Sequence, residues 1–192
     1  MNYEKYLSVL ICLIAISLSG CAVHYKDLSY RDQAFIKESP IEKLTYRIKD
    51  LPVFASNDGL QAIEDALTNS KISASSEEYY GKDVYDEGFY VFVEPLYKPP
   101  GAPATVFGYI SVSTLTLLPA WSNEDGYRIR YSVYQDGEIV KTFQYDRERF
   151  LALWLLVLPF AWVNLFTTSE YDAFYSATNE FLTDLQPILD KP

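Results

Sequence analysis

The sequence predicts an α+β fold in which a mainly antiparallel sheet packs against two helices, with a late apolar segment. Three observations point to it. The apolar patterns run in the order strand, helix, short strand, strand, strand, hairpin and final helix. The composition of 17 Tyr and 11 Phe against one Met favours strands with an aromatic interior. Asp136-Gly137 stands between two alternating runs, which predicts a hairpin with a two-residue type I′ turn.

The first twenty residues have the pattern of an export signal. A short polar start precedes the apolar run Leu7 to Leu18, which is too short to span a membrane as a finished helix. The run ends in Leu18-Ser19-Gly20-Cys21, which resembles the lipobox of bacterial lipoprotein precursors. The resemblance implies that residues 1–20 are removed as a signal peptide and that Cys21 carries palmitate-type acyl chains. With Ala22 next rather than Asp, it also implies sorting to the outer membrane, facing the periplasm.

After the cleavage site we expect a tether over residues 21–40 and a single α+β domain over residues 41–192. The tether is mixed and polar, without a sustained period. The net charge of -10 argues against nucleic acid and against polybasic docking on anionic lipid. The second cysteine, Cys12, lies in the signal, so the mature chain cannot form an internal disulfide.

The first half of the domain shows strand and helix patterns in turn. Alternating apolar residues predict a strand at 44–48, closed by Leu51-Pro52. A helix capped by Asn57 or Asp58 follows, with Leu60, Ile63, Ala66 and Leu67 on one face. A short strand is expected near residues 71–75, and then an acidic loop to residue 88.

Two β-rich runs come next. Residues 89–97 predict a central strand whose ladder is interrupted at Pro95. The β-branched residues of 106–118 favour another strand, ended by Pro119, and a helix is the alternative.

The Asp136-Gly137 turn predicts the faces of its two strands, near residues 127–134 and 138–146. Counting from the turn gives a core face of Tyr127, Ile129, Tyr131, Val133, Val140 and Thr142. The opposite face is aromatic and basic, and its members form a candidate ligand face for a carboxylate or phosphate: Arg128, Arg130, Lys141, Tyr134, Phe143 and Tyr145. The alternative is a solvent face whose cations pair with acids, or a face covered by the last helix.

Residues 150–166 contain no charge. As a helix they would reach roughly 25 Å, just short of a bilayer core. Three interpretations remain open: a full span, a buried core segment, and a hairpin broken at Pro159 that dips into the membrane. The candidate membrane or partner contacts are Trp154, Leu155, Leu156, Pro159, Phe160 and Trp162. A final helix is expected to open with a Thr167–Glu170 capping box and to end at Pro187.

Chemical groups suited to catalysis are scarce. His24 is the only histidine and lies three residues from the acylated end, so we expect no catalytic triad, and the mature chain lacks the cysteines and histidines of a zinc site. No phosphate-binding glycine loop and no cofactor motif occur. Acidic clusters at 77–87 and 123–125 leave a carboxylate-pair hydrolase as a distant third hypothesis.

The late Trp-, Leu- and Pro-rich segment before a final helix resembles that of uncharacterised envelope lipoproteins. The resemblance implies a non-enzymatic, membrane-anchored module with an envelope protein partner, accessory to an envelope assembly. The alternative is a carrier lipoprotein for a small ligand or lipid, which would hold a cavity over the hairpin.

Overall fold

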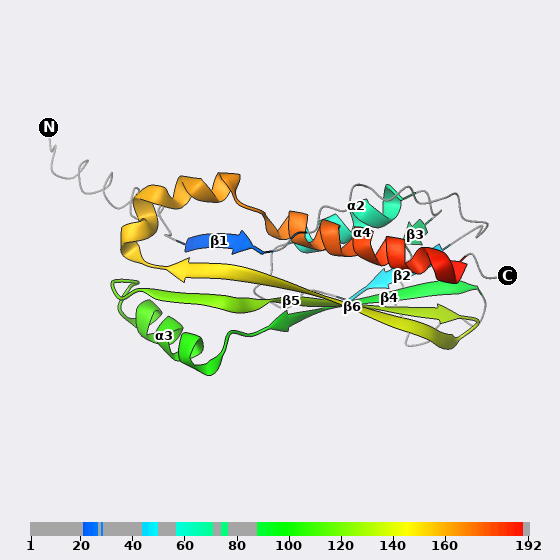
Figure 1. Ribbon diagram of the computed structural model, residues 1–192, viewed down its shortest axis with the longest axis horizontal. Coiled ribbons are helices and arrows are strands. Elements are labelled where there is room, and N and C mark those ends of the chain that lie inside the picture. The colour runs from blue at the N-terminus through cyan, green and yellow to red at the C-terminus, as the bar shows by residue number, and fades with distance from the viewer. Residues whose placement is uncertain are drawn as a thin grey trace, which may run out of the picture. The chain divides into compact units, whose positions relative to one another are not determined.

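The computed structural model describes residues 21–26, 28, 44–49, 57–70, 74–76 and 88–189 (Figure 1). They fall into two compact units. The first, here called the apolar unit, contains the residues up to His24 together with Pro99–Asp125 and Arg149–Thr168; the second, the sheet unit, contains Tyr25–Lys98, Gly126–Glu148 and the chain from Ser169 on. This division is not visible in the sequence pattern, which predicts one domain over 41–192. The signal peptide, most of the tether and the 77–87 acidic cluster lie outside the described residues.

Six strands form one sheet in the order β1-β6-β5-β4-β2-β3. Their bounds are β1 (Cys21–Tyr25), β2 (Leu44–Ile48), β3 (Ala74–Ser76), β4 (Phe89–Lys98), β5 (Ala120–Gln135) and β6 (Glu138–Leu153). The short β2 pairs in parallel with β3 and β4, whereas β4 pairs antiparallel with β5 along its full length. β5 and β6 are joined by a two-residue turn, so they too are antiparallel. The predicted α+β class with a mainly antiparallel sheet is confirmed.

Two of the predicted strands differ in detail from the expectation. β4 continues through Pro95, which is paired with Ile129 of β5. The carbonyl of Val93 accepts a hydrogen bond from the N–H of Lys49, so the backbone polar groups of Val93 point toward β2. Alternate residues of a strand point their backbone groups to the same side, so the nitrogen of Pro95 also points toward β2, at a position beyond the last residue of that strand. The missing N–H of Pro95 therefore removes no hydrogen bond from the sheet. At the other end of the chain, residues 21–25 of the predicted tether form strand β1.

The hairpin turn is confirmed, because Asp136 and Gly137 have φ angles of 51° and 83°, as a type I′ turn requires. The predicted faces of β6 are wrong from residue 140 on. Val140 and Thr142 are exposed, and Phe143 and Tyr145 are buried. A shift of one residue between two strands exchanges every side chain between the faces. Counting from the turn therefore did not predict the burial of Phe143 and Tyr145.

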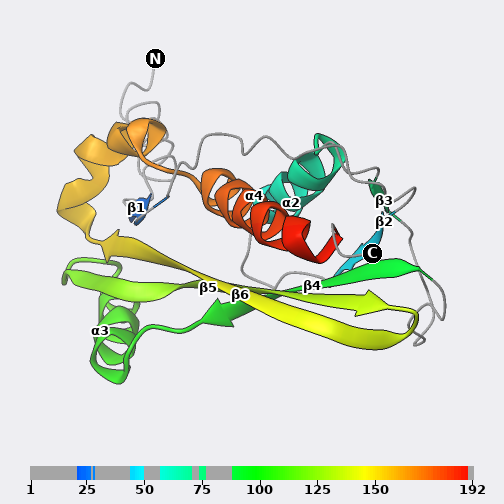
Figure 2. The same cartoon turned by 45° about the vertical axis from the view of Figure 1, so that its right-hand side comes forward.

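Helices α2 (Asp58–Thr68) and α4 (Glu170–Leu189) pack against each other, and both lie on the same face of the sheet (Figures 1 and 2). The predicted inward face of α2 is right in Ile63, Ala66 and Leu67, which are buried. Asn57 stands at its N-cap without a side-chain hydrogen bond. At α4 the capping pair is Ser169 and Asp172, which bond each other's backbone N–H, instead of Thr167 and Glu170.

The core of the sheet unit is an aromatic cluster between the sheet and α4. The ring of Phe181 stacks on Tyr131 at 4.2 Å and meets the edge of Phe143 at 5.6 Å, while Phe174 meets Tyr127 at 5.0 Å. The hydroxyl of Tyr131 shares a 2.8 Å hydrogen bond with Thr178, so its polar end is satisfied inside the core. Pro187 lies inside α4, which continues to Leu189 rather than ending at the proline.

The apolar unit holds β1 except Tyr25, the first part of β5, the last part of β6 and two further helices, α3 (Ala102–Ser113) and the 3-10 helix η1 (Leu155–Phe166). The strand favoured for 106–118 is wrong, and the helical alternative is right. Pro103 fits the first turn of a helix, and Thr105 closes that turn by donating its N–H to Gly101. A helix satisfies its own backbone groups, so it forms here despite β-branched residues whose strand preference depends on context.

Candidate functional site

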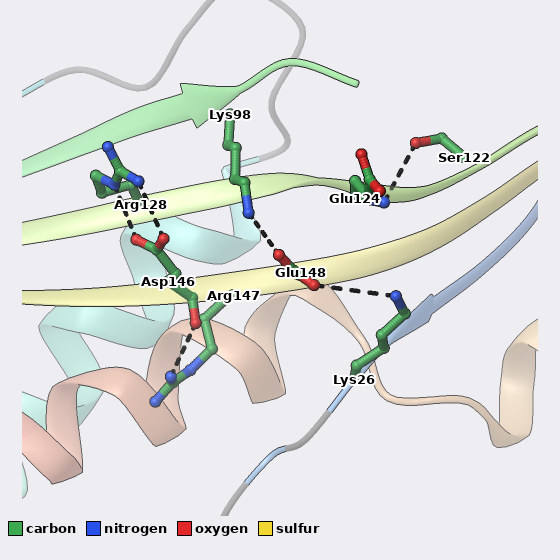
Figure 3. A network of polar contacts seen from close by, with 8 residues as sticks. All are labelled: Lys26, Lys98, Ser122, Glu124, Arg128, Asp146, Arg147 and Glu148. Atoms are coloured by element: carbon green, nitrogen blue, oxygen red, sulfur yellow. Dashed lines mark hydrogen bonds and ion pairs between the residues drawn. The ribbon is translucent and has the colours of Figure 1, made fainter. Parts of the chain in front are cut away.

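The candidate ligand face is not assembled. Arg128 donates two hydrogen bonds to Asp146, at 2.8 and 3.1 Å (Figure 3). Arg130 donates to Glu94 at 3.2 Å. The hydrogen bond from Arg128 lowers the pKa of the Asp146 carboxyl, and the same bond raises the pKa of Arg128. Both arginines therefore belong to a paired outer face of the sheet, which was the predicted alternative.

The aromatic members of that face lie elsewhere. Phe143 and Tyr145 point into the core under α4, where burial, and then the hydrogen bond to Asp184, raises the pKa of Tyr145 far above its ordinary value. Lys141 lies 4.4 Å from the centre of the Phe143 ring. Tyr134 is half-buried and stands beside Tyr90. The six residues thus divide between the two faces of the sheet and form no common ligand face.

The outer face carries a second ionic group. Glu148 binds Lys98 through one carboxylate oxygen and approaches Lys26 at 4.0 Å through the other (Figure 3). Arg147, on the inner face, donates to Glu180 of α4 at 2.7 Å and lies under the helix. Every Lys and Arg side chain drawn in Figure 3 has a carboxylate or carbonyl partner. We therefore interpret these contacts as structural ion pairs and hydrogen bonds.

Residues 150–153 of the predicted contact segment end strand β6, and residues 155–166 form η1, in which Val157 and Asn164 are half-buried. Leu155, Leu156, Trp162, Val163 and Phe166 are exposed, and Trp154 is half-buried. These residues exclude the buried-core interpretation. The side chains of Pro159 and Phe160 lie outside the described residues, and the backbone is helical through Pro159, so the predicted break there is wrong. The chain instead turns at Trp154, which is extended between β6 and η1.

Among the described residues, no helix is both long enough and apolar enough to cross a membrane. The membrane-dipping interpretation expects exposed apolar side chains, which η1 has, but it also expects a break at Pro159, which η1 lacks. Contact with a membrane or a partner stays a prediction.

Both ends of η1 are tied to other parts of the apolar unit. At its start, Leu155 donates its N–H to the carbonyl of Thr116 at 2.8 Å, in the turn after α3. At its end, the side chain of Asn164 accepts the N–H of Val23 at 3.1 Å, and Thr167 donates to the Val23 carbonyl at 2.8 Å. Val23 lies two residues after Cys21. The predicted lipidation position and η1 therefore belong to one hydrogen-bonded group.

A second apolar surface in the same unit was missed by the sequence reasoning. Residues 102–121, here called the α3 protrusion, comprise α3 and the turn that leads into β5. Its large apolar side chains are exposed rather than buried: Val106, Phe107, Tyr109, Ile110, Val112, Leu115, Leu117, Leu118 and Trp121. The signal available in the sequence was the absence of any charged residue from 99 to 123, which matches the charge-free run at 150–166.

A buried ion pair holds β5 and β6 together in the apolar unit. Arg149 donates from Nε and Nη2 to one oxygen of Asp125, at 3.1 and 3.0 Å. Asp125 is fully buried, and its other oxygen has no hydrogen-bond partner in the described structure. Residues 123–125 therefore belong to strand β5, so the acidic loop expected there is wrong.

Among the described residues, hollows large enough for small molecules occur in both units. One in the apolar unit, of about 720 Å³, is lined mainly by α3 and the start of β5, with Phe107, Ile110 and Trp121 among its walls. The other, in the sheet unit near the hairpin, measures about 570 Å³ and lies between β6 and the end of α4, with Phe143, Asp184 and Pro187 among its walls. The carrier hypothesis predicts a cavity over the hairpin, and the second hollow lies in that region.

The remaining polar candidates form no assembled site. His24 shares a hydrogen bond of 3.0 Å with Thr168 at the exposed start of the apolar unit. Over the described part of the chain, no three His, Cys, Asp or Glu side chains gather as a metal site would require.

Comparisons with known proteins gave weak structural likenesses and no match by sequence. No family model matches the sequence, and no curated protein matches it. Among solved structures, a minor lipoprotein from Acinetobacter baumannii is similar, with 9% identity and a TM-score of 0.41, over 78% of this chain and 95% of that one. At this TM-score the likeness carries no argument, so the proposals below rest on this chain's own residues.

Proposed function

We propose that the protein is a non-enzymatic lipoprotein of the cell envelope, anchored through acylated Cys21 and serving as an accessory module for an envelope protein partner. The observation that carries the proposal is the exposed, charge-free surface of η1, which is hydrogen-bonded to the strand that begins at Cys21. A water-facing helix normally has a charged side, and η1 has none. An apolar surface of this kind marks an interaction site.

Acylation supports a fixed location for that surface. Two or more acyl chains hold a protein firmly at a membrane, whereas one holds it marginally. Because β1 starts at Cys21, few residues separate the anchor from η1, and the surface stays close to the membrane plane. Outer-membrane sorting, facing the periplasm, is the location implied by Ala22 after the lipobox.

The partner contact is tested by photocrosslinking in living cells. A photoreactive amino acid replaces Trp162 of η1, which is 58% exposed, and the matched control replaces Ile139 of the sheet unit, which is 61% exposed. We expect one discrete protein adduct from position 162 and none from position 139. Recovery of uncrosslinked monomer from both positions, at equal expression, would contradict the proposal.

A carrier lipoprotein is the second candidate, favoured by the apolar hollow of about 720 Å³ in the apolar unit. Its volume is in the range of small-molecule pockets. Native mass spectrometry of protein released from mild detergent distinguishes the two functions. A carrier would retain a bound lipid or small molecule in fixed stoichiometry, and the accessory module would not.

A further inference from the structure

The α3 protrusion is built with its large side chains outward. The least exposed residues of α3 are small or hydroxylated and form one stripe at helical spacing: Ala104, Thr105, Gly108 and Ser111. Ser111 is the one residue of α3 that is buried. Outside that stripe the helix is exposed, and its large apolar side chains, such as Phe107 and Val112, occupy the exposed sides. This is the reverse of a helix in a water-soluble domain.

Four hydroxyls of the protrusion donate to backbone carbonyls of α3 or of the residues that flank it. Thr105 donates to Gly101 at 3.1 Å, and Thr114 donates to Ile110 at 3.0 Å. Ser111 donates to the carbonyl of Leu118 at 2.7 Å, which binds the end of the turn back to the helix. Ser113 likewise donates to Tyr109. Hydroxyls that return to the helix's own carbonyls meet the condition that hydrocarbon imposes, since lipid offers no hydrogen bonds.

The turn that follows α3 presents leucines at the cost of strain. Leu115 and Thr116 have φ angles of 53° and 61°, a left-handed conformation that is strained for residues other than glycine. Backbone bonds from Leu115 to Val112 and from Thr116 to Ser111 hold the conformation. The result is a tip on which Leu115 is 82% exposed. In water the exposed leucine side chain at this tip contributes no favourable burial, whereas in an apolar phase it would be buried.

We propose that the α3 protrusion inserts into the lipid bilayer and forms a second membrane contact beside acylated Cys21. This inference rests on the proposed membrane anchoring. A protein partner would cover one side of a helix, whereas the apolar side chains of α3 surround it except along its small-residue stripe. Its 12 residues span about 18 Å, close to the roughly 15 Å of hydrocarbon in one leaflet. Trp121, which follows the turn, is exposed, and tryptophan is enriched at membrane interfaces.

Continuity with the anchor supports a lipid occupant. The turn of the protrusion is hydrogen-bonded to the start of η1, and the end of η1 is bonded to Val23, two residues after Cys21. All these residues belong to the apolar unit. The acyl chains and the protrusion therefore lie in the same compact body, which the acyl chains hold at the membrane surface.

Insertion is tested with single cysteines on the lipidated full chain. The mature protein has no cysteine besides Cys21, whose thiol carries lipid, so an introduced cysteine is the one free thiol. Val112→Cys and Leu117→Cys take an environment-sensitive fluorophore in the protrusion, and Ile139→Cys takes it in the sheet unit. Val112 and Ile139 are both 61% exposed, which matches the control for local exposure. The proteins are reconstituted in phosphatidylethanolamine–phosphatidylglycerol vesicles with or without nitroxide-labelled acyl chains.

We expect blue-shifted emission at positions 112 and 117, and quenching by the nitroxide lipid several-fold greater than at position 139. Quenching equal to that at 139 would overturn the proposal. Blue-shifted emission without lipid quenching would also overturn it and would indicate a protein cover, such as a second copy. The mass of the Cys21 peptide is measured on the same samples. An unmodified Cys21 contradicts the proposed anchoring, whereas loss of quenching on an acylated chain contradicts insertion alone.

Discussion

Removal of Arg149 tests how the apolar unit is held together. Arg149→Met keeps an apolar stem but leaves the carboxyl of Asp125 without its cation. Asp125 is fully buried, and Arg149 contacts one of its oxygens at 3.0 and 3.1 Å. Breaking a buried pair costs about 3–5 kcal/mol. Because the Arg149 side chain is 18% exposed, we expect a loss near the lower end of that range in the free energy of unfolding.

Arg128→Met is the matched control, because Arg128 also binds an aspartate with two hydrogen bonds but does so on the outer face of the sheet. Exposed pairs contribute little, so a much smaller loss is expected. Urea unfolding in mild detergent is followed by tryptophan fluorescence, which reports on the apolar unit because Trp121, Trp154 and Trp162 all lie there.

The double variant Asp125→Leu/Arg149→Met separates the loss of the ion pair from the penalty of leaving the Asp125 carboxylate buried without its cation. Replacing both partners removes the unpaired carboxyl, so it should recover most of the stability lost by Arg149→Met. Equal unfolding free energies for Arg149→Met and Arg128→Met would refute the account of Asp125 as a buried group that depends on its cation.

Three further changes test the sheet unit, each with its own comparison. Phe143→Ala should lower the free energy of urea unfolding by about 3–5 kcal/mol, because the ring is buried against Phe181. Val140→Ala should lower it by much less, because Val140 is exposed. Equal losses of unfolding free energy would contradict the observed burial along β6. Gly126→Ala should unfold or strongly destabilise the chain, because a Cβ there would lie 2.0 Å from the carbonyl oxygen of Arg147. The control Gly108→Ala in α3 should be tolerated, because its Cβ meets no atom within 4 Å. Thermal melts compare the two variants, and a Gly126→Ala chain as stable as the wild type would refute the close approach. The raised pKa of buried Tyr145 predicts that its contribution to stability is fully present below the ordinary tyrosine pKa of about 10 and is lost as pH rises above it. Tyr145→Phe should therefore reduce the fall of the melting temperature between neutral pH and pH 11. An unchanged dependence of the melting temperature on pH would contradict this prediction.

Local patterns predicted the sheet unit well where a local rule was sufficient. The type I′ turn at Asp136-Gly137, the inward face of the first helix and strand β4 each follow from residues near one another in sequence. The faces of β6 did not follow, because register far from a turn depends on the regularity of every pair between. Phe143 and Tyr145 were placed on the ligand face for this reason, and burial against α4 decides their position.

The apolar unit was harder to predict because its pattern contradicts the usual rule. Apolar, β-branched residues at 106–118 favour a buried strand when water is the assumed solvent. In the structure they form a helix that exposes them, and the same is true of η1. The two charge-free runs were visible in the sequence, but their meeting in one unit depends on long-range bonds such as Leu155 to Thr116. Periodicity alone does not report such contacts.

The central claim is that the chain works as a lipid-anchored envelope protein, and the mass of the intact protein tests it most directly. The protein is extracted from membranes and measured whole. The account predicts a chain that begins at Cys21, with a mass increased by a diacylglyceryl group or by that group and a further acyl chain. A chain that begins at Met1, or one with an unmodified Cys21, would contradict it.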